Sequence, residues 1–580
     1  MMFEVERKME KQVSAPVIYE TAYTDLATYD LEEKVRQEIG EENVEYITDY
    51  PTVYIIQDDR LKKRSKYKVY VGETNDIAQR TNEHLIKDSK NGNYWDNFRN
   101  SKTSLMYVIG HEHFNKSLTL DIENKMMQYL SCVPNVEKIH NKRTNAQKKY
   151  YTSNEMSLIF TKIWKKLHEK NQNLFISEQE IVNSAIFKAS PFHSLTKEQE
   201  KAQTAILELV DKAIAKKQSG QLILVRGEAG SGKTVLMSSL FYNLAKRAKD
   251  VHLLVNHNEQ LTVYKTIASK LDLEKKKDEV VAKPTSFINK HSPKQKVDVI
   301  LVDEAHLLLT QGKQSYRGKN QLIDLLDRAK VVIAVFDDKQ ILTREQIWQE
   351  DILQTLGNDY PVQEFTLMNQ MRMNANEKTI DWLRTLIDDG TIKTLPKDDK
   401  YDLRVFDDPA KMHQAIVEKN QEQAGLSRMV ATFDWEYKTN SKGDLSYVQI
   451  GDWKLPWNLQ LKDPNSSKED SWAEQAITIN EIGSTYTIQG FDLNYAGVIL
   501  GPSVTYRDGK IVFDPAKSAN KKATQRRSII TKEGSQMISF GPELLKHELN
   551  VLLTRGVKGL YLYAVDEQLQ KELMKKVRNN

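Results

Sequence analysis

The sequence predicts an α/β protein in which two domains built on parallel sheets follow a smaller α/β domain. Two observations lead to this prediction. Strand-like and helical stretches alternate from Leu195 onward, and at Pro51 a mixed, acidic segment gives way to short runs typical of β-strands. A chain of 580 residues exceeds what one hydrophobic core normally serves. Its 39% hydrophobic and 28% charged residues are typical of an ordinary globular protein.

The second part of the chain repeats a strand, a loop and a helix. Its apolar runs are short and continuous, as expected of strands that are buried on both faces of a parallel sheet. They lie at Leu222–Val225, His252–Val255, Val297–Val302 and Val331–Phe336, and again at Arg428–Phe433, Ala496–Leu500 and Leu560–Ala564. This alternation predicts doubly wound domains over residues 191–355 and 356–580, the latter with an insertion near 390–475.

The first part of the chain predicts a compact α/β domain over residues 51–150. Strands are expected at Thr52–Gln57, Tyr67–Gly72 and Ser104–Ile109, and helices at Ile77–Ile86 and Leu120–Leu130. Residues 1–50 are interpreted as an N-terminal extension with one helix, Leu31–Ile39. Residues 151–190 are charged and are predicted to form a helical connector.

Composition restricts the classes of function. The 84 basic and 80 acidic residues leave a net charge of only +4, so any nucleic-acid surface must arise from local clusters. The single cysteine, Cys132, excludes a disulfide framework and predicts a buried thiol in a reducing compartment. No run is long enough to span a bilayer, so we expect a cytoplasmic protein without a membrane partner. Self-association and protein partners stay open.

A phosphate-binding loop is the strongest motif in the chain. The segment Gly227–Thr234 reads GEAGSGKT, fits G-x-x-x-x-G-K-[ST], and lies between a predicted strand and a predicted helix. In such a loop, backbone amides converge on phosphates at a helix N-terminus, and Lys233 adds its charge. Thr234 would offer a hydroxyl to Mg²⁺. The residues expected to bind the phosphates of ATP are Gly227, Gly230, Ser231, Gly232 and Lys233.

Two acids follow the predicted strand Val297–Val302. Asp303 and Glu304 emerge at the carboxyl end of that strand, where ligands of parallel sheets bind. Asp303 is expected in the magnesium shell. Glu304 is expected to orient or activate the attacking water.

The order Asp-Glu-Ala-His at Asp303–His306, with the motifs around it, resembles superfamily 1 helicases. The closest resemblance is to a bacterial group of helicase-like P-loop proteins related to the Schlafen ATPase domain, and it extends from Leu195 to the C-terminus. It implies two RecA-like domains that close on ATP. The residues that it adds are Gln199 in SLTKEQ for adenine, Gln340 in DDKQ and Arg372 in QMR for the γ-phosphate, Gln489 and Gly490 in STYTIQG, and Arg555 in LLTRG.

An arginine from a second domain would make hydrolysis depend on domain closure, because phosphoryl transfer needs positive charge at the γ-phosphate. Lys233 and Arg555 lie far apart in the sequence, as a cleft between two sheets requires.

The N-terminal domain carries a second resemblance. Thr52-Val53-Tyr54 and Tyr70-Val71-Gly72 lie on consecutive predicted strands, followed by Arg80 and His84. This pattern resembles the GIY-YIG nuclease family and implies a small α/β GIY-YIG-like domain. The resemblance also implies a metal-binding acid on a later helix, which matches Glu123, and a final asparagine, which matches Asn141 or else Asn145.

The chemistry of these residues is coherent for phosphodiester hydrolysis. Glu123 with Mg²⁺ would supply a metal-bound oxygen, and Arg80 a cation beside the scissile phosphate. Tyr54 or Tyr70, together with His84, would accept the proton of water.

Two hypotheses of different classes follow. In the first, a helicase-like ATPase feeds or regulates a metal-dependent endonuclease on nucleic acid, with DNA favoured over RNA, in defence or repair by analogy. The basic clusters Arg60–Lys68 and Lys521–Arg527 would contact phosphates. In the second, ATP closes a switch or sensor whose N-terminal domain binds nucleic acid or protein without cleaving it.

Overall fold

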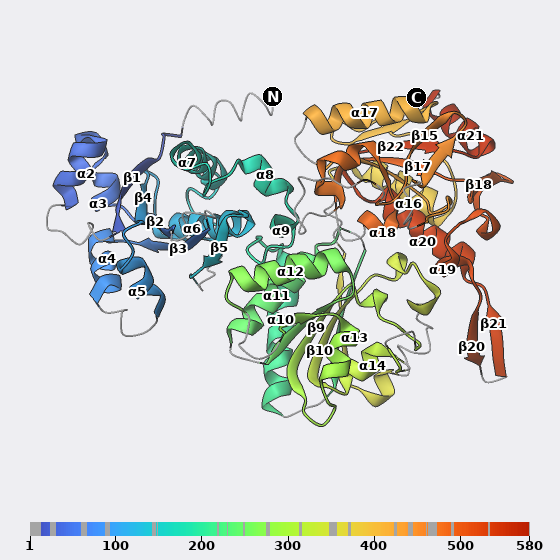
Figure 1. Ribbon diagram of the computed structural model, residues 1–580, viewed down its shortest axis with the longest axis horizontal. Coiled ribbons are helices and arrows are strands. Elements are labelled where there is room, and N and C mark those ends of the chain that lie inside the picture. The colour runs from blue at the N-terminus through green and yellow to red at the C-terminus, as the bar shows by residue number, and fades with distance from the viewer. Residues whose placement is uncertain are drawn as a thin grey trace. The chain divides into compact units, whose positions relative to one another are not determined.

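The computed structural model of the chain (Figure 1) is described for most of its length. The described residues are 13–23, 31–59, 66–86, 93–141, 147, 149–216, 220–228, 230–247, 250–273, 279–312, 316–318, 320–346, 356–368, 373–422, 426–438, 445–459, 461, 472–488, 492–531 and 534–578. The chain divides into two compact units. The first comprises Met1–Ser194 and Tyr264–Asp278, and the second comprises Leu195–Val263 and Glu279–Asn580.

The first unit is built on a five-stranded sheet with the strand order β1-β4-β2-β3-β5. The strands β1, β4, β2 and β3 are antiparallel neighbours, whereas β5 pairs with β3 in parallel. The bounds are β1 (Val17–Ala22), β2 (Thr52–Asp58), β3 (Tyr67–Thr74), β4 (Ser104–Gly110) and β5 (Val136–Ile139). The edge strand β1 belongs to the region interpreted as an extension, and its buried Ile18 and Tyr19 show why it joins the sheet.

Eight helices are described in the main segment of this unit. They are α2 (Leu31–Ile39), α3 (Glu45–Thr48), α4 (Ile77–Ile86), α5 (Asn93–Arg99), α6 (Lys116–Cys132), α7 (Met156–Lys170), α8 (Glu178–Asn183) and α9 (Ala185–Lys188). Helices α2 and α4 begin and end at the predicted residues. Cys132 ends α6 and is buried, and burial raises the pKa of its thiol to about 11.

Helix α7 differs from the predicted connector. Its side chains Phe160 and Trp164 are buried and meet the Tyr129 ring of α6, at centroid distances of 4.7 and 5.0 Å. A helix with one fully buried face is part of a core. Residues 156–170 therefore complete the first unit instead of linking it to the next.

The second unit contains two parallel sheets, as predicted. The first has the order β11-β6-β10-β9-β7-β8. Its strands are β6 (Gln221–Gly227), β7 (Val251–Val255), β8 (Val281–Ala282), β9 (Val297–Asp303), β10 (Ala329–Phe336) and β11 (Val362–Leu367). Its helices are α10 (Lys197–Ala215), α11 (Lys233–Lys246), α13 (Pro284–Lys290) and α14 (Gln321–Leu326). Helix α12 (Asn258–Lys270) begins in this unit, and its residues from Tyr264 onward belong to the first unit. Strand β11 pairs with β6, so this sheet extends past residue 355.

The second parallel sheet has the order β12-β22-β17-β13-β16. Its strands are β12 (Asp402–Val405), β13 (Arg428–Ala431), β16 (Ile482–Gly483), β17 (Leu493–Leu500) and β22 (Gly556–Ala564). Its helices are α16 (Glu377–Asp388), α17 (Pro409–Glu422), α18 (Thr485–Ile488), α19 (Lys521–Thr524), α20 (Gly541–Leu553) and α21 (Glu567–Arg578).

The predicted insertion near 390–475 needs correction. Within it, β12 and β13 pair into the second sheet. Helix α17 packs on that sheet, because its Met412 and Ile416 share a buried core with Met429 of β13. A hairpin of β14 (Tyr447–Ile450) and β15 (Trp453–Pro456) pairs separately. Two further hairpins follow, β18 (Val504–Arg507) with β19 (Lys510–Phe513), and β20 (Arg527–Thr531) with β21 (Gly534–Ile538).

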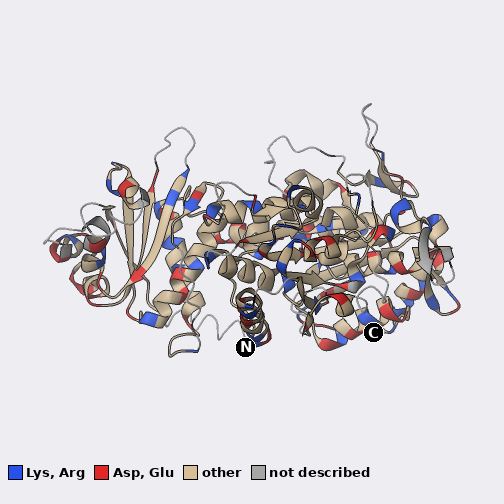
Figure 2. Ribbon diagram, turned by 90° about the horizontal axis from the view of Figure 1, so that it is seen from below, with Lys and Arg blue, Asp and Glu red and all other residues tan. Residues whose placement is uncertain are grey.

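None of the helices that the structure describes combines the length and apolar character that spanning a bilayer requires. Basic and acidic residues are intermixed along the ribbon (Figure 2), in keeping with the small net charge.

Candidate functional site

The predicted phosphate loop joins β6 to α11. Strand β6 ends at Gly227 and α11 begins at Lys233, so Gly230 and Ser231 lie in the turn between them. Gly232 is the N-cap of α11 with a φ of 77°, in the left-handed region that glycine adopts without a steric cost. The loop therefore directs the first backbone amides of α11 toward its concave side, as an anion site requires.

Gln199 lies against this loop. Its Oε1 accepts from the backbone N of Thr196 at 2.9 Å and thereby completes the capping box of α10. Its Nε2 donates to the carbonyls of Ser231 and Gly232, at 3.2 and 3.3 Å. The position beside the loop fits a nucleotide-binding residue, and its role toward adenine stays a prediction.

Lys233 is 7% exposed and its ammonium group is fully engaged by the site. Nζ donates to the carbonyl oxygens of Gly227 at 2.6 Å and Glu228 at 2.8 Å, and it lies 3.1 Å from Asp337 Oδ2. Thr234 follows in the first turn of α11.

The two predicted acids lie at the end of β9. Asp303 is 1% exposed, and its Oδ1 accepts from the backbone N of Glu304 at 3.0 Å. Glu304 adopts φ 51° and ψ 49°, a left-handed conformation that costs about 1 kcal/mol or more for a residue with a side chain. Its Oε2 lies 3.4 Å from Nε2 of the buried His306. Thr234 and Asp303 offer only oxygen atoms, the donors that Mg²⁺ prefers.

A chain of hydrogen bonds connects the two parallel-sheet domains at this site. Gln340 Nε2 donates to Asp337 Oδ2 at 2.6 Å, and Arg555 Nη2 donates to Gln340 Oε1 at 3.0 Å. Asp337 in turn accepts from Lys233. The sequence prediction named Gln340 and Arg555 separately, and the structure brings them into direct contact.

Asp337 is a buried acid beside the phosphate loop, and the sequence analysis included it in the motif DDKQ without giving it a role. Burial alone would raise its pKa, but Lys233 and His306 outweigh burial and the pKa of Asp337 is lowered. The carboxylate therefore stays charged at neutral pH. Its position directly after β10, comparable to that of Asp303 as the last residue of β9, is the signal in the sequence that points to it.

The remaining helicase-like residues are only partly described. Arg372, Gln489 and Gly490 lie outside the described residues. The described part of the motif STYTIQG, which contains Gln489 and Gly490, forms α18. There His257 Nε2, from the loop after β7, lies 3.3 Å from the carbonyl oxygen of Tyr486. Tyr486 also donates its hydroxyl to Asn520 Oδ1 at 3.2 Å.

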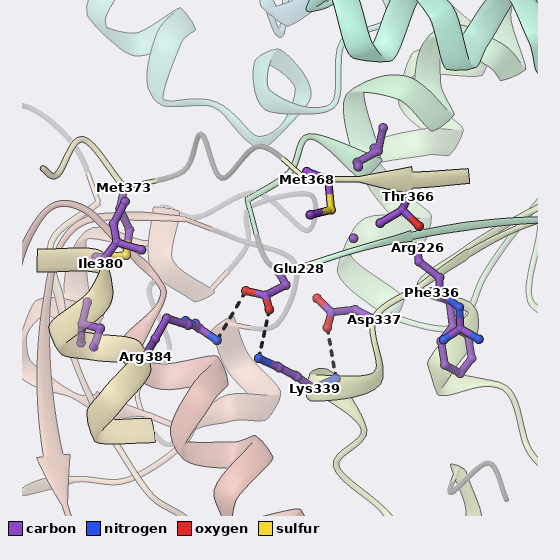
Figure 3. Close-up of a pocket in the computed structure, with 13 residues that line it drawn as sticks. Arg226, Glu228, Phe336, Asp337, Lys339, Thr366, Met368, Met373, Ile380 and Arg384 are labelled. Atoms are coloured by element: carbon purple, nitrogen blue, oxygen red, sulfur yellow. Dashed lines mark hydrogen bonds and ion pairs between the residues drawn. The ribbon is translucent and has the colours of Figure 1, made fainter. Parts of the chain in front are cut away.

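A cavity of about 550 Å³ opens beside the phosphate loop (Figure 3). Its walls come from β6, β10, β11, α16 and the residues that follow them. They are Arg226, Gly227, Glu228, Phe336, Asp337, Lys339, Thr366, Leu367, Met368, Met373, Ile380, Leu383 and Arg384. The volume is within the range of small-molecule pockets.

The tyrosine strands of the first unit form a second cluster. Tyr54 of β2 stacks on Tyr70 of β3 at a centroid distance of 5.9 Å, and both rings are buried. Gly72 lies beneath Tyr54, where a Cβ would come within 2.5 Å of the Tyr54 hydroxyl, so only glycine fits. Burial and Tyr70 raise the pKa of Tyr54 well above its usual value, while Arg80 of α4 opposes them.

Glu123 and Asn141 form the other half of this cluster. Glu123 of α6 is 5% exposed, and its Oε1 accepts from Asn141 Nδ2 at 2.7 Å. Asn141 Nδ2 also donates to the carbonyl of Val71, next to Gly72, so both halves meet the end of β3. Carboxylate and amide oxygens suit a divalent metal. The described residues contain no group of three or more His, Cys, Asp or Glu side chains placed for a metal.

Two predicted members of this cluster cannot be placed. The side chain of His84 and the whole of Asn145 lie outside the described part of the chain. Arg80 Nη1 donates to Glu83 Oε2 at 3.0 Å, one turn along α4.

Comparison with known proteins assigns both parts of the chain. Residues 220–566 match the Schlafen group 3 DNA/RNA helicase domain, and residues 50–131 match the GIY-YIG catalytic domain. The uncharacterized protein YPL245W of Saccharomyces cerevisiae is 34% identical over 429 residues, which cover 66% of this chain and 91% of the yeast protein.

Pif1 helicases are among the solved structures that align with the chain. The Pif1 helicase from Candida albicans aligns at 12% identity and a TM-score of 0.28, covering 66% of this chain and 99% of that chain. A structure of two coordinating Pif1 helicases that unwind forked dsDNA aligns at 13% identity and a TM-score of 0.26, covering 65% of this chain and 94% of that chain.

Proposed function

The chain belongs to the family of the Schlafen group 3 DNA/RNA helicase domain, and from this premise we propose that ATP turnover in it controls a metal-dependent endonuclease that acts on DNA. A helicase-like ATPase domain and a GIY-YIG domain together make the chain a nucleic-acid enzyme.

The observation that carries the proposal is the hydrogen-bonded chain from Lys233 through Asp337 and Gln340 to Arg555. Lys233 begins α11 in the first parallel-sheet domain, whereas Arg555 follows α20 in the second. A movement of one domain against the other must therefore change the charges around the phosphates. This geometry supports ATP turnover that is coupled to domain closure.

Each residue of the ATP site has a chemical task in this proposal. Lys233 and Arg555 stabilise the negative charge that develops on the transferred phosphoryl group. Glu304 orients the attacking water, and Gln340 positions Arg555. Thr234 and Asp303 would hold Mg²⁺, which neutralises phosphate charge when bound.

The residues around Tyr54 and Glu123 in the first unit would each have a separate task in phosphodiester cleavage. Arg80 offers a cation to the scissile phosphate, and Tyr54 or Tyr70 handles the proton of the attacking water. Glu123, oriented by Asn141, would hold a divalent cation that polarises the phosphate when bound.

An exposed basic segment supports nucleic acid as the partner. Lys521 and Lys522 of α19 are exposed, as is Arg526 just after this helix, and Lys522 Nζ lies 5.3 Å from the centre of the Tyr486 ring. Such lysines and arginines contact phosphates without reading sequence. We favour DNA over RNA, and defence or repair as the setting, by analogy with enzymes that pair a motor with a nuclease.

ATP hydrolysis with and without single-stranded DNA tests the proposal. We expect DNA to raise the hydrolysis rate of the wild type at least several-fold, and we expect Lys233→Ala to abolish hydrolysis. The Lys212→Ala variant removes an exposed lysine of α10 and serves as the control. An RNA arm decides between the two nucleic acids.

A nicking assay on supercoiled plasmid with Mg²⁺ tests the nuclease half. Glu123→Gln and Arg80→Ala should each lose nicking, while Lys102→Ala, at an exposed lysine of the same unit, should keep it. If DNA does not stimulate ATP hydrolysis and nicking is absent from the wild type, the proposal is wrong and an ATP-dependent switch or sensor takes its place.

A further inference from the structure

Two of the cations that line the cavity beside the phosphate loop point toward one carboxylate (Figure 3). Lys339 Nζ lies 3.0 Å from Glu228 Oε1, and Arg384 Nη1 lies 3.6 Å from Glu228 Oε2. Lys339 comes from the loop after β10 and Arg384 from α16, so they belong to different parallel-sheet domains. Glu228 is the second residue of the phosphate loop itself.

Asp388 and Asn550 also hold Lys339 and Arg384 in place, independently of Glu228. Asp388 Oδ2 lies 3.2 Å from Lys339 Nζ and 4.0 Å from Arg384 Nη1. Arg384 Nη2 donates to Asn550 Oδ1 at 3.0 Å, and Asn550 Nδ2 donates to the carbonyl of Lys339 at 3.1 Å. These contacts would keep Lys339 and Arg384 in place if Glu228 moved away.

The contact between Arg384 and Glu228 is incomplete. Arg384 Nη1 is buried and has no hydrogen-bond partner within the described part of the chain, although the ion pair with Glu228 lies near it. The Glu228 side chain is 52% exposed, and exposed ion pairs contribute little to stability. A phosphate group binds arginine more strongly, because it offers several charged oxygens to the planar guanidinium.

We propose that Lys339 and Arg384 bind the terminal phosphate of the nucleotide, and that Glu228 is the internal anion which this phosphate replaces. The inference rests on the proposed ATPase function and adds two phosphate-binding residues to it. Gly227 lines the same cavity, so a phosphate held by the loop borders both cations. Because α16 supplies Arg384, the second domain would then contact the nucleotide directly.

Equilibrium binding of a non-hydrolysable ATP analogue and of ADP tests this assignment. Arg384→Gln, which retains a donor for Asn550, should raise the Kd of the analogue about 10-fold or more and leave the Kd of ADP within about 2-fold. Arg384→Lys should lie between that variant and the wild type. Glu228→Gln should lower the Kd of the analogue about 2–5-fold, since it removes a competitor worth an exposed ion pair.

The double variant Glu228→Gln with Arg384→Gln shows whether the two residues act through each other. We expect the gain from Glu228→Gln to shrink when Arg384 is absent. The control is Arg507→Ala, which breaks a 2.8 Å pair with Asp566 in the same domain but outside the cavity. It should change neither Kd.

Other results separate the possible failures. If Arg384→Gln changes the Kd of ADP and the analogue equally, or changes neither, or if Glu228→Gln weakens the analogue, the pair is only structural. If the wild type binds neither nucleotide, the proposed ATPase function itself fails. Melting curves of each variant show whether it is folded. If Arg384→Gln is unfolded, the Kd values of Arg384→Lys for the analogue and for ADP test the assignment instead.

Discussion

Asp337 is the acceptor between the phosphate-loop lysine and the arginine of the second domain. Its carboxylate is 3% exposed and receives hydrogen bonds from Lys233 and Gln340. Gln340 depends on this contact for its orientation toward Arg555. At the scale of single residues, we therefore expect the charge of Asp337 to hold Lys233 directly, and Arg555 through Gln340.

Asp337→Asn should lower the kcat of ATP hydrolysis about 10- to 100-fold, because a hydrogen bond to a charged group contributes about 1.5–3 kcal/mol. Steady-state hydrolysis measures kcat and KM separately. The matched control is Asp298→Asn, which breaks a 2.7 Å pair with Lys330 near the start of β9 in the same domain. If Asp337→Asn hydrolyses ATP at the wild-type rate, Asp337 has no role in hydrolysis.

At the scale of elements, α20 carries a buried acid toward the helicase-like motif at α18. Glu548 is 1% exposed, and its Oε1 accepts from the backbone N of Phe433 at 2.7 Å. Burial, and then the nearby Asp434, raise the pKa of Glu548 to about 8. The same helix ends just before Arg555, so its packing positions that residue.

This raised pKa predicts a pH dependence of stability. Below the ordinary pKa of about 4.5, Glu548 is protonated in both the folded and the unfolded chain and contributes nothing. Between pH 4.5 and 8 only the unfolded chain ionises, so the stability of the fold decreases as the pH rises. Above pH 8 both states are ionised and the decrease stops.

Glu548→Gln should remove this decrease. Denaturation midpoints at pH 5, 6.5 and 8 should show the wild type falling progressively below the variant. Glu543→Gln, at an exposed position of α20, should follow the wild type at every pH. A constant difference between wild type and Glu548→Gln across this range would contradict the assignment.

At the scale of the whole molecule, the chain consists of two compact units with separate clusters of functional residues. Tyr54, Arg80 and Glu123 lie in the first unit, whereas Lys233 and Arg555 lie in the second. Each unit has its own buried apolar core. Units with separate cores are expected to unfold in separate steps.

Calorimetry of the full chain should therefore resolve two transitions. An ATP analogue with Mg²⁺ at about 100 times its Kd should stabilise one of them by about 2.7 kcal/mol and leave the other in place. Lys233→Ala should abolish the shift. A single transition, or an equal shift of both, would show that the two units unfold together.

Much of the fold could be predicted because its signals are local. Helices α2 and α4 begin and end at the predicted residues, and the apolar runs became the central strands of both parallel sheets. The segments around β1 and α7 are rich in charged residues, so the sequence alone favours an extension and a connector there. Whether Tyr19 or Trp164 is buried depends on partners elsewhere in the chain.

The sequence by itself determined the phosphate loop, since Gly227–Thr234 is contiguous and its glycines are required by the geometry of one turn. It also determined that acids follow β9 and that tyrosines lie on β2 and β3. Only the tertiary structure decided which distant residues share a site. Gln340 and Arg555 are 215 positions apart and still meet at 3.0 Å. Such contacts form where the two parallel-sheet domains pack against each other, and no local pattern of residues encodes them.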